Sequence, residues 1–168
     1  MSQRGKYEVL ARYYNEYLPR VLNYMRLRTD DEALAQDLTA RTFERALLRL
    51  HTLRDEGAFG GWLFAIARTE VAGYYRRRRP QLPLESAYGL PAPAESAEGQ
   101  VVHSEELASL RGALAVLKER EQEIIRLKFI AGLTNRAIGK AMGLREGNVA
   151  VILYRALRQV RAQLESKD

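Results

Sequence analysis

Apolar side chains recur every three or four residues along the first 50 positions of the chain. One series comprises Val9, Tyr13, Tyr17, Val21 and Tyr24, and a second comprises Leu34, Leu38, Ala46 and Leu50. This spacing places apolar residues on one face of an α-helix, and the strict alternation typical of a half-buried strand is missing. Between the two series, Thr29, Asp30 and Asp31 offer side chains that can cap a helix start.

The helical pattern is interrupted at two places further along the chain. Gly57, Gly60 and Gly61 precede a third helix centred on residues 62–75. Between Pro80 and Ser104, four prolines stand among Ala, Ser, Glu and Gly residues with little periodicity. That composition is typical of a flexible linker, which we place at residues 81–104.

Helical spacing returns after the linker. It predicts four helices, which run from Glu105 to Leu117, Arg120 to Ile130, Asn135 to Ala141 and Arg145 to Leu164. The expected fold class is therefore all-α, with two small helical domains, residues 1–80 and 105–168, joined by the linker.

Residue composition excludes several kinds of site. The chain has no Cys, which rules out disulfides, thiolate metal ligands and cysteine nucleophiles. His51 and His103 lie far apart without metal-ligand spacing, so we expect no metal and no cofactor. The longest apolar run, Phe59 to Ala67, is too short and too interrupted by glycine to cross a bilayer. We expect a cytoplasmic protein without membrane insertion.

The charge balance points to a polyanionic partner. Lys and Arg number 27 against 21 Asp and Glu, a net charge of +6 with a pI near 9.7, and most of the cations are Arg. Guanidinium groups bind phosphate through a bidentate fork, so nucleic acid is the first expectation and an anionic membrane surface the second. No carboxylate cluster or nucleophile is evident, so we do not expect an enzyme.

Residues 134–157 have the pattern of a helix-turn-helix. Such a motif needs a small residue where two helices approach, a glycine at the turn and an apolar residue on the second helix, and Gly139, Gly143 and Val149 meet these needs. The expected buried side is completed by Ile138, Met142, Leu144, Leu153 and Leu157. A plain helical hairpin fits the same spacing. DNA binding is favoured by the basic residues Arg136, Lys140, Arg145, Arg155, Arg158 and Arg161.

The same region resembles a known family. The segments LKEREQEIIRL (117–127), GLTNRAIGKAMGL (132–144) and EGNV (146–149) resemble the C-terminal promoter-binding domain of extracytoplasmic-function (ECF) sigma factors. The resemblance implies that this domain reads the upstream, minus-thirty-five promoter element. The recognition helix of the family usually continues with Thr-Val-Lys/Arg-Ser-Arg, whereas here residues 148–152 are NVAVI. The candidate DNA-binding residues are Arg136, Arg145, Glu146, Asn148, Tyr154 and Arg155.

The segment DLTARTFERA (37–46) resembles the family's Asp-Leu-x-Gln-Glu-x-Phe helix, whose exposed side binds the largest polymerase subunit. We expect Leu38 and Phe43 in the core. The family's Gln-Glu pair is Ala40-Arg41 here, which reverses a charge on that side. The resemblance implies four polymerase-binding candidates, which are Asp37, Arg41, Glu44 and Arg45.

The segments WLFAIAR (62–68) and YYRRRR (74–79) resemble the family's helix that melts and reads the downstream, minus-ten element. A core position is favoured for Trp62 over base stacking, and Thr69 stands where the family usually has Asn. A run of four arginines is also often a solvated helix end. The candidate residues for the downstream element are Arg54, Asp55, Trp62, Arg68, Thr69, Tyr75, Arg76, Arg77, Arg78 and Arg79.

Taken in order, these motifs imply a sigma factor of the ECF class, with core RNA polymerase and promoter DNA as partners and an anti-sigma protein as a common regulator in the family. A stand-alone helix-turn-helix regulator is the alternative, although it leaves the segments at 37–46 and 62–79 unexplained. A DNA-processing enzyme is a third hypothesis, for which the sequence offers no catalytic group.

Overall fold

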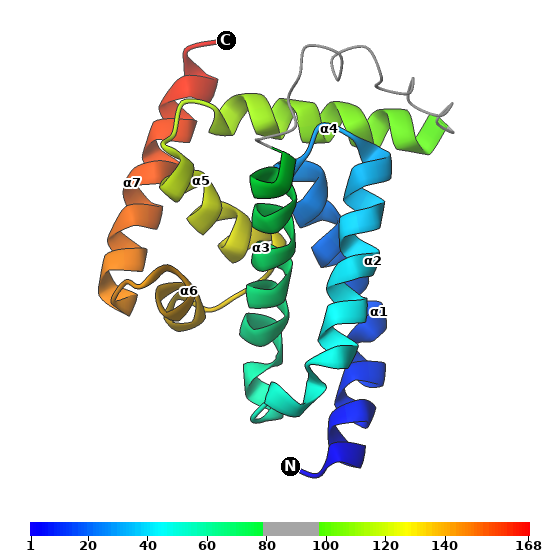
Figure 1. The fold of residues 1–168 in the computed structure, drawn as a ribbon. Helices are drawn as coiled ribbons and strands as arrows, with labels where there is room; N and C mark the ends of the chain where they lie inside the picture. The colour runs from blue at the N-terminus through cyan, green and yellow to red at the C-terminus, as the bar shows by residue number, and fades with distance from the viewer. Residues whose placement is uncertain (79–97) are drawn as a thin grey trace. The chain divides into compact units, whose positions relative to one another are not determined.

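The computed structural model of the chain describes residues 1–78 and 98–168, with side chains from residue 105 onward in the second range. Every regular element in these ranges is helical, so the all-α prediction is confirmed. The chain divides into two compact units (Figure 1). The first unit contains α1 (Gln3–Arg28), α2 (Glu32–Leu48), the 3-10 turns η1 (Leu50–Thr52) and η2 (Glu56–Ala58), and α3 (Phe59–Arg78). The second unit contains α4 (Glu98–Leu114), α5 (Glu119–Ile125), η5 (Arg126–Ile130), α6 (Asn135–Met142) and α7 (Glu146–Glu165).

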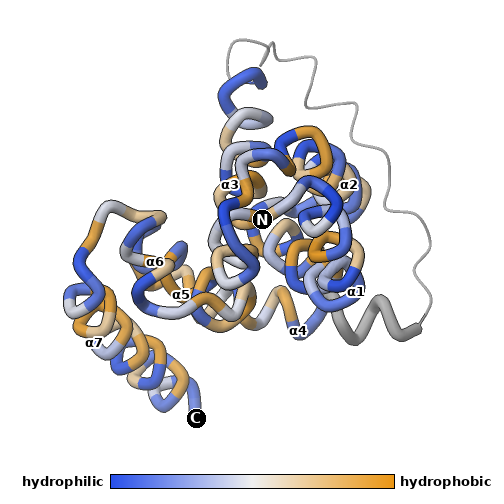
Figure 2. Tube along the Cα trace, turned by 90° about the horizontal axis from the view of Figure 1, so that it is seen from below, coloured by the Kyte–Doolittle hydropathy of each residue, from blue (hydrophilic) through white to orange (hydrophobic). Residues whose placement is uncertain are grey.

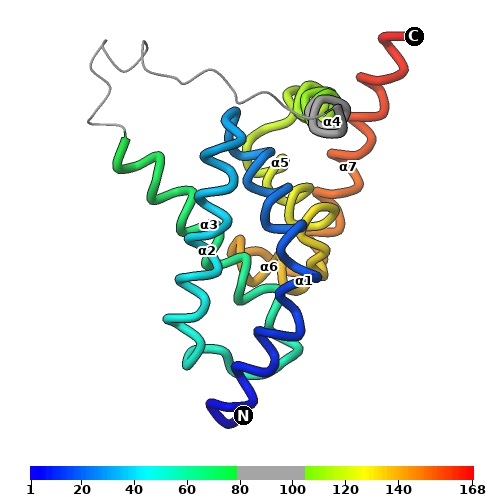
Figure 3. Tube along the Cα trace, turned by 90° about the vertical axis from the view of Figure 1, so that its right-hand side faces the viewer, coloured from blue at the N-terminus to red at the C-terminus, as the bar shows by residue number. Residues whose placement is uncertain are grey.

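The first unit is a bundle in which α1, α2 and α3 all contact one another (Figure 3). Tyr24 and Phe64 are fully buried where α1 meets α3, with ring centroids 5.5 Å apart in an edge-to-face arrangement. Burying one such side chain stabilises the fold by about 1.5–3 kcal/mol. Leu38 and Phe43 are buried on α2, as predicted.

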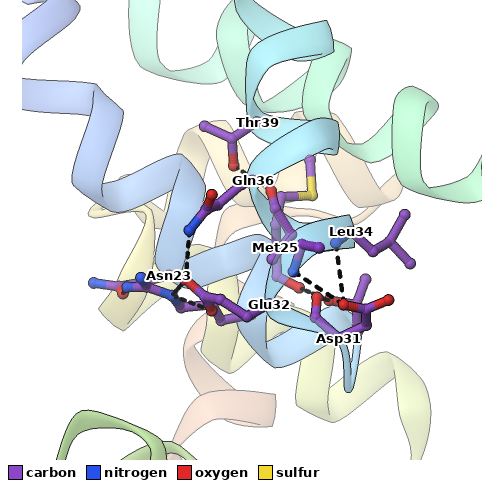
Figure 4. Close-up of polar contacts among 11 residues, drawn as sticks. Asn23, Met25, Asp31, Glu32, Leu34, Gln36 and Thr39 are labelled. Carbon is purple, nitrogen blue, oxygen red and sulfur yellow. Dashed lines mark hydrogen bonds and ion pairs between the residues drawn. The ribbon is translucent and has the colours of Figure 1, made fainter. Parts of the chain in front are cut away.

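Hydrogen bonds fix the corner between α1 and α2 (Figure 4). The Thr29 hydroxyl donates to the Met25 carbonyl at 2.9 Å, which closes the end of α1. Asp31 is the N-cap of α2, and its carboxylate accepts from the Ala33 and Leu34 backbone N–H groups. Arg26 forms an ion pair of 2.6 Å with Glu32 in the first turn of α2. The sequence prediction of a helix start here is confirmed.

The second unit buries the apolar face of α7 against α5 and α6. Its fully or almost fully buried side chains include Ile124, Ile138, Val149, Leu153 and Ala156. Apolar and polar positions alternate along α7 at helical spacing (Figure 2). Leu157 does not share the buried face and is 44% exposed, so its predicted core position is wrong. The buried positions on α7 fall at steps of three and four residues from Val149, and Leu157 lies to one side of them.

Helix boundaries in the second unit also differ from the predictions. The helix expected from Glu105 starts at Glu98, inside the predicted linker. Arg79 and most of that linker belong to residues 79–97, which lie outside the described residues. The helix expected to reach Ile130 changes at Arg126 into a π turn, with a bond of 3.0 Å from the Ala131 N–H to the Arg126 carbonyl. Arg126 itself is buried and pairs with Glu119 at 2.5 Å and Glu123 at 3.4 Å. No helix within the described ranges has the length and apolarity that a membrane span needs.

Candidate nucleic-acid interfaces and a partner-binding face

The turn between α6 and α7 has the geometry that the glycine spacing predicted. Thr134 caps α6 by accepting from the Ala137 N–H at 3.1 Å. Gly143 ends the helix with φ of 70°, a left-handed conformation that favours glycine. A Cβ atom on Gly139 would lie 2.5 Å from the Leu144 carbonyl oxygen, so the helix and the turn approach too closely for a side chain. The two helices therefore form a helix-turn-helix.

All six residues predicted to bind the upstream element are exposed. Arg145 is the N-cap of α7, and Glu146 and Asn148 follow in its first turn. Helical spacing places Asn148 and Arg155 on the same side, since they are seven residues apart. Tyr154 is 64% exposed and the Arg158 guanidinium lies 5.8 Å from its ring centroid. The structure thus brings together a basic surface with an exposed aromatic ring on α7, and Arg136 adds an exposed cation from α6.

The last turn of α3 carries a second basic surface. Arg76 and Arg77 are exposed, whereas Arg78 is half-buried and its guanidinium contacts the Tyr74 hydroxyl and lies 5.5 Å from the Tyr74 ring centroid. The Tyr75 hydroxyl donates to the Arg28 carbonyl at 2.7 Å, and partial burial raises the pKa of Tyr75 above its usual value. The predicted arginines are therefore not equivalent, because Arg78 is already engaged within the unit.

The segment before α3 is shaped by polar contacts. Asp55 caps the η2 turn by accepting from the Ala58 N–H at 3.0 Å, and Arg54 beside it is exposed. The Glu56 carboxylate accepts from Arg12 at 2.6 Å and from the Tyr13 hydroxyl at 2.8 Å, and that second bond raises the pKa of Tyr13. Sequence reasoning missed Glu56, because its partners lie more than 40 residues earlier. This loop is tied to α1 rather than free to move alone.

Trp62, Arg68 and Thr69 lie at different depths along α3. Trp62 is half-buried, although a core position was favoured for it. Its indole N–H donates to the exposed Thr52 hydroxyl at 2.8 Å, which keeps this part of the ring near the surface. Its ring also packs against Phe59 at a centroid distance of 5.7 Å. Arg68 is half-buried, and Thr69 is exposed with its hydroxyl donating to the Ala65 carbonyl. Trp62 is therefore partly open to solvent, while its indole N–H anchors the loop through Thr52.

Predicted partner-binding residues line the outer face of α2. Asp37, Arg41, Glu44 and Arg45 are all exposed. Arg41 pairs with Asp37 at 3.2 Å, and Arg45 pairs across the bundle with Glu70 of α3, also at 3.2 Å. The Arg45 charge is thus partly balanced within the unit.

An apolar groove runs beside these charges, between α1 and α2. Tyr14 and Phe43 meet in it with ring centroids 5.0 Å apart, and the side of Glu44 forms part of its wall. Its other apolar lining residues are Leu10, Leu18, Leu22, Ala40 and Leu47. Sequence analysis missed this groove. The available sequence signal was Leu47, an apolar residue that lies off the buried face of α2 and lines the groove.

Comparison with known proteins assigns the chain to a family. Residues 13–81 match the family model Sigma-70 region 2, and residues 113–162 match Sigma-70, region 4. The chain is similar to the ECF RNA polymerase sigma factor BldN of Streptomyces coelicolor, with 35% identity over 160 residues that cover 94% of this chain and 61% of BldN. It thus spans less than two thirds of that relative's length.

A second relative agrees with this assignment, and a solved structure shares the fold. The ECF RNA polymerase sigma factor ShbA of Streptomyces griseus is 30% identical over 158 residues, covering 88% of this chain and 83% of ShbA. The sigma factor RpoE of Bartonella quintana, solved in complex with the anti-sigma factor NepR, shares the fold with a TM-score of 0.67 at 20% identity, over 91% of this chain and 96% of that one. With both sigma-70 regions present in order and a relative aligned over most of its length, the chain belongs to the ECF family of RNA polymerase sigma factors.

Proposed function

We propose that this chain directs core RNA polymerase to promoters, binds promoter DNA through both units and assists strand opening at initiation. The proposal rests on one observation: the region 2 match is followed along the chain by the region 4 match, on two helical units that each have an exposed arginine surface. On α3 that surface is Arg76 and Arg77, and on α7 it includes Arg145 and Arg155. Sigma factors are transcription initiation factors, and we propose that this one acts by binding, without catalysis of its own.

The end of α3 is suited to hold a separated DNA strand. Opening a duplex without nucleotide hydrolysis requires that unstacked bases be captured and that their backbone be bound by cations. Arg76 and Arg77 supply free guanidinium groups for phosphates, while Tyr75 and the partly exposed Trp62 offer aromatic surface. In this role, Arg78 orients Tyr74 rather than binding a phosphate directly.

The outer face of α2 and the adjacent groove are suited to bind the polymerase core. Protein interfaces commonly have an apolar centre and a polar rim, and here Tyr14 and Leu47 line the groove beside Glu44. Arg41 and Asp37 lie one and two turns before Glu44 on α2. The exposed Leu47 would be covered by such a partner, which removes apolar surface from water. We propose that the polymerase occupies this face.

Run-off transcription from a promoter library tests the proposal. The full chain with core polymerase should produce transcripts from a subset of promoters that core polymerase alone does not use. The stand-alone regulator predicts instead that the chain binds duplex DNA equally well without polymerase and adds no transcripts. We do not favour it, because it gives no role to the region 2 match over residues 13–81.

We further propose that the chain works in the cytoplasm and that an anti-sigma protein holds it inactive by masking one or both units. The support is family membership together with the exposed apolar groove, which a masking protein would cover. Affinity purification of the tagged chain from unstressed cells should recover this regulator in place of polymerase. Recovery of the polymerase complex alone would argue against such masking.

A further inference from the structure

The exposed face of α7 carries apolar side chains among its arginines. Val151 is 47% exposed and Tyr154 is 64% exposed, and they lie three residues apart on the side away from the buried Val149 and Leu153. Exposed arginines adjoin them, with Arg155 four residues after Val151. A helix face that contacts only water has no need of exposed apolar side chains beside its arginines.

The glycine one turn before Val151 has no structural reason to be a glycine. A Cβ atom on Gly147 would meet no atom within 4 Å, and the residue does not have a positive φ. A glycine inside a helix is less favourable than alanine, so the fold itself would be more stable with a side chain there. Glycine at such a position is explained when another molecule must approach the helix backbone closely.

The chemistry of the major groove matches this surface. Among the four base pairs, the C5-methyl group of thymine is the apolar feature on the major-groove edge, and small apolar side chains contact it. The phosphates lie on both sides of the groove, where guanidinium groups are favoured. Asn148, one turn from Val151, carries the amide that pairs with adenine N6 and N7.

We propose that Val151 reads the methyl group of a thymine in the upstream element, that Asn148 reads an adenine in the same or the adjacent base pair, and that the bare backbone at Gly147 allows the helix to sit deeply enough to do so. This inference rests on the proposed function, since it takes α7 as the recognition helix. It assigns a preference for A·T pairs to Asn148 and Val151, which stand where the family's recognition helix usually has Thr and Ser.

The experiment starts by selecting upstream sequences. The full chain assembled with core polymerase is presented with duplexes that carry a fixed downstream element and a random upstream segment. In the selected duplex, each thymine is replaced in turn by deoxyuridine, which lacks only the methyl group. At one position we expect wild-type affinity to fall about three- to fivefold, the value of one buried methyl group.

Two pairs of variants complete the test. V151A should remove the sensitivity to deoxyuridine at that position, while V116A, which shortens another exposed valine of the same unit, should keep it. G147A should weaken binding to the selected duplex at least fivefold without loss of helical content, while G112A, equally open in space on α4, should leave binding unchanged.

Several results would overturn the inference. One is a selected element without thymine, and another is a deoxyuridine effect of equal size in wild type and V151A. A third is a V151A variant that binds DNA normally but assembles poorly with polymerase, which would make the patch a protein contact. Failure of the proposed function is distinguishable, because then the wild-type chain would support no promoter-dependent transcript at all.

Discussion

Replacing Gly139 by alanine tests the close approach on which the helix-turn-helix depends. The new Cβ would lie 2.5 Å from the Leu144 carbonyl oxygen, whereas ordinary contacts begin at 3.4 Å, so the turn must move by about 0.9 Å. That movement strains the 2.8 Å hydrogen bond from the Leu144 N–H to the Gly139 carbonyl. Overpacking and a weakened hydrogen bond together lower the free energy of unfolding by about 2–4 kcal/mol, and the better helix propensity of alanine raises it by about 1 kcal/mol. We expect a net destabilisation of about 2 kcal/mol.

Urea unfolding of the full chain measures this change. With an m-value of about 1 kcal/mol/M for a unit of this size, the helical transition of the second unit should move down by about 2 M. Trp62 is the single tryptophan and lies in the first unit, so its fluorescence reports that unit separately and its midpoint should stay in place.

The matched control is G112A, because a Cβ at Gly112 meets nothing within 4 Å. That variant should be equally stable or more stable by up to about 1 kcal/mol. A G139A midpoint equal to that of G112A would refute the packing argument, since both changes add the same methyl group to a helix.

Three further predictions concern the first unit. Replacing Arg76 and Arg77 by alanine should lower the salt dependence of open-complex formation by up to about one slope unit per lost phosphate contact; an unchanged slope in a salt titration would remove them from the interface. Reversing the charge of Asp37 and Glu44 should weaken binding to core polymerase in a pull-down while circular dichroism stays unchanged, and full binding would exclude this face. Because burial raises the pKa of Tyr75 in the folded state, the stability linked to its neutral form is present below its usual pKa of about 10 and is lost as pH rises through the folded value. Thermal melts of Y75F should therefore lose less stability above pH 10 than wild type, and identical pH profiles would contradict this.

Local rules were enough to predict much of the fold. Helical spacing located the helices, Asp31 acts as the cap that its side chain allows, and Gly139 and Gly143 stand where the turn between α6 and α7 needs them. These features depend on residues within one or two turns of each other. For the same reason the exposure of the six upstream candidates followed from the amphipathic patterns of α6 and α7.

Features that depend on tertiary placement were missed. The α1–α2 groove exists because Tyr14 and Phe43, distant in sequence, meet across two helices. The exposure of Leu157 depends on which neighbours cover α7, and the π turn occurs where the buried Arg126 guanidinium pairs with Glu119 and Glu123. No helical period encodes these choices, because each is decided by a contact between elements.

The ion pair between Arg45 and Glu70 connects the two functions proposed for the first unit, which are polymerase binding by α2 and DNA binding by α3. Glu70 lies on α3 with only 12% of its side chain exposed, and its partner Arg45 lies on the face of α2 that we propose binds polymerase. If a polymerase carboxylate displaces Glu70 from Arg45, the Glu70 carboxylate loses this cation on α3, the helix that carries the arginines proposed to bind DNA. By linkage, if DNA binding at α3 changes the free energy of polymerase binding through this exchange, polymerase binding changes the free energy of DNA binding by the same amount. A single salt bridge of 3.2 Å would thus couple polymerase affinity to promoter affinity, with the same size whichever partner binds first.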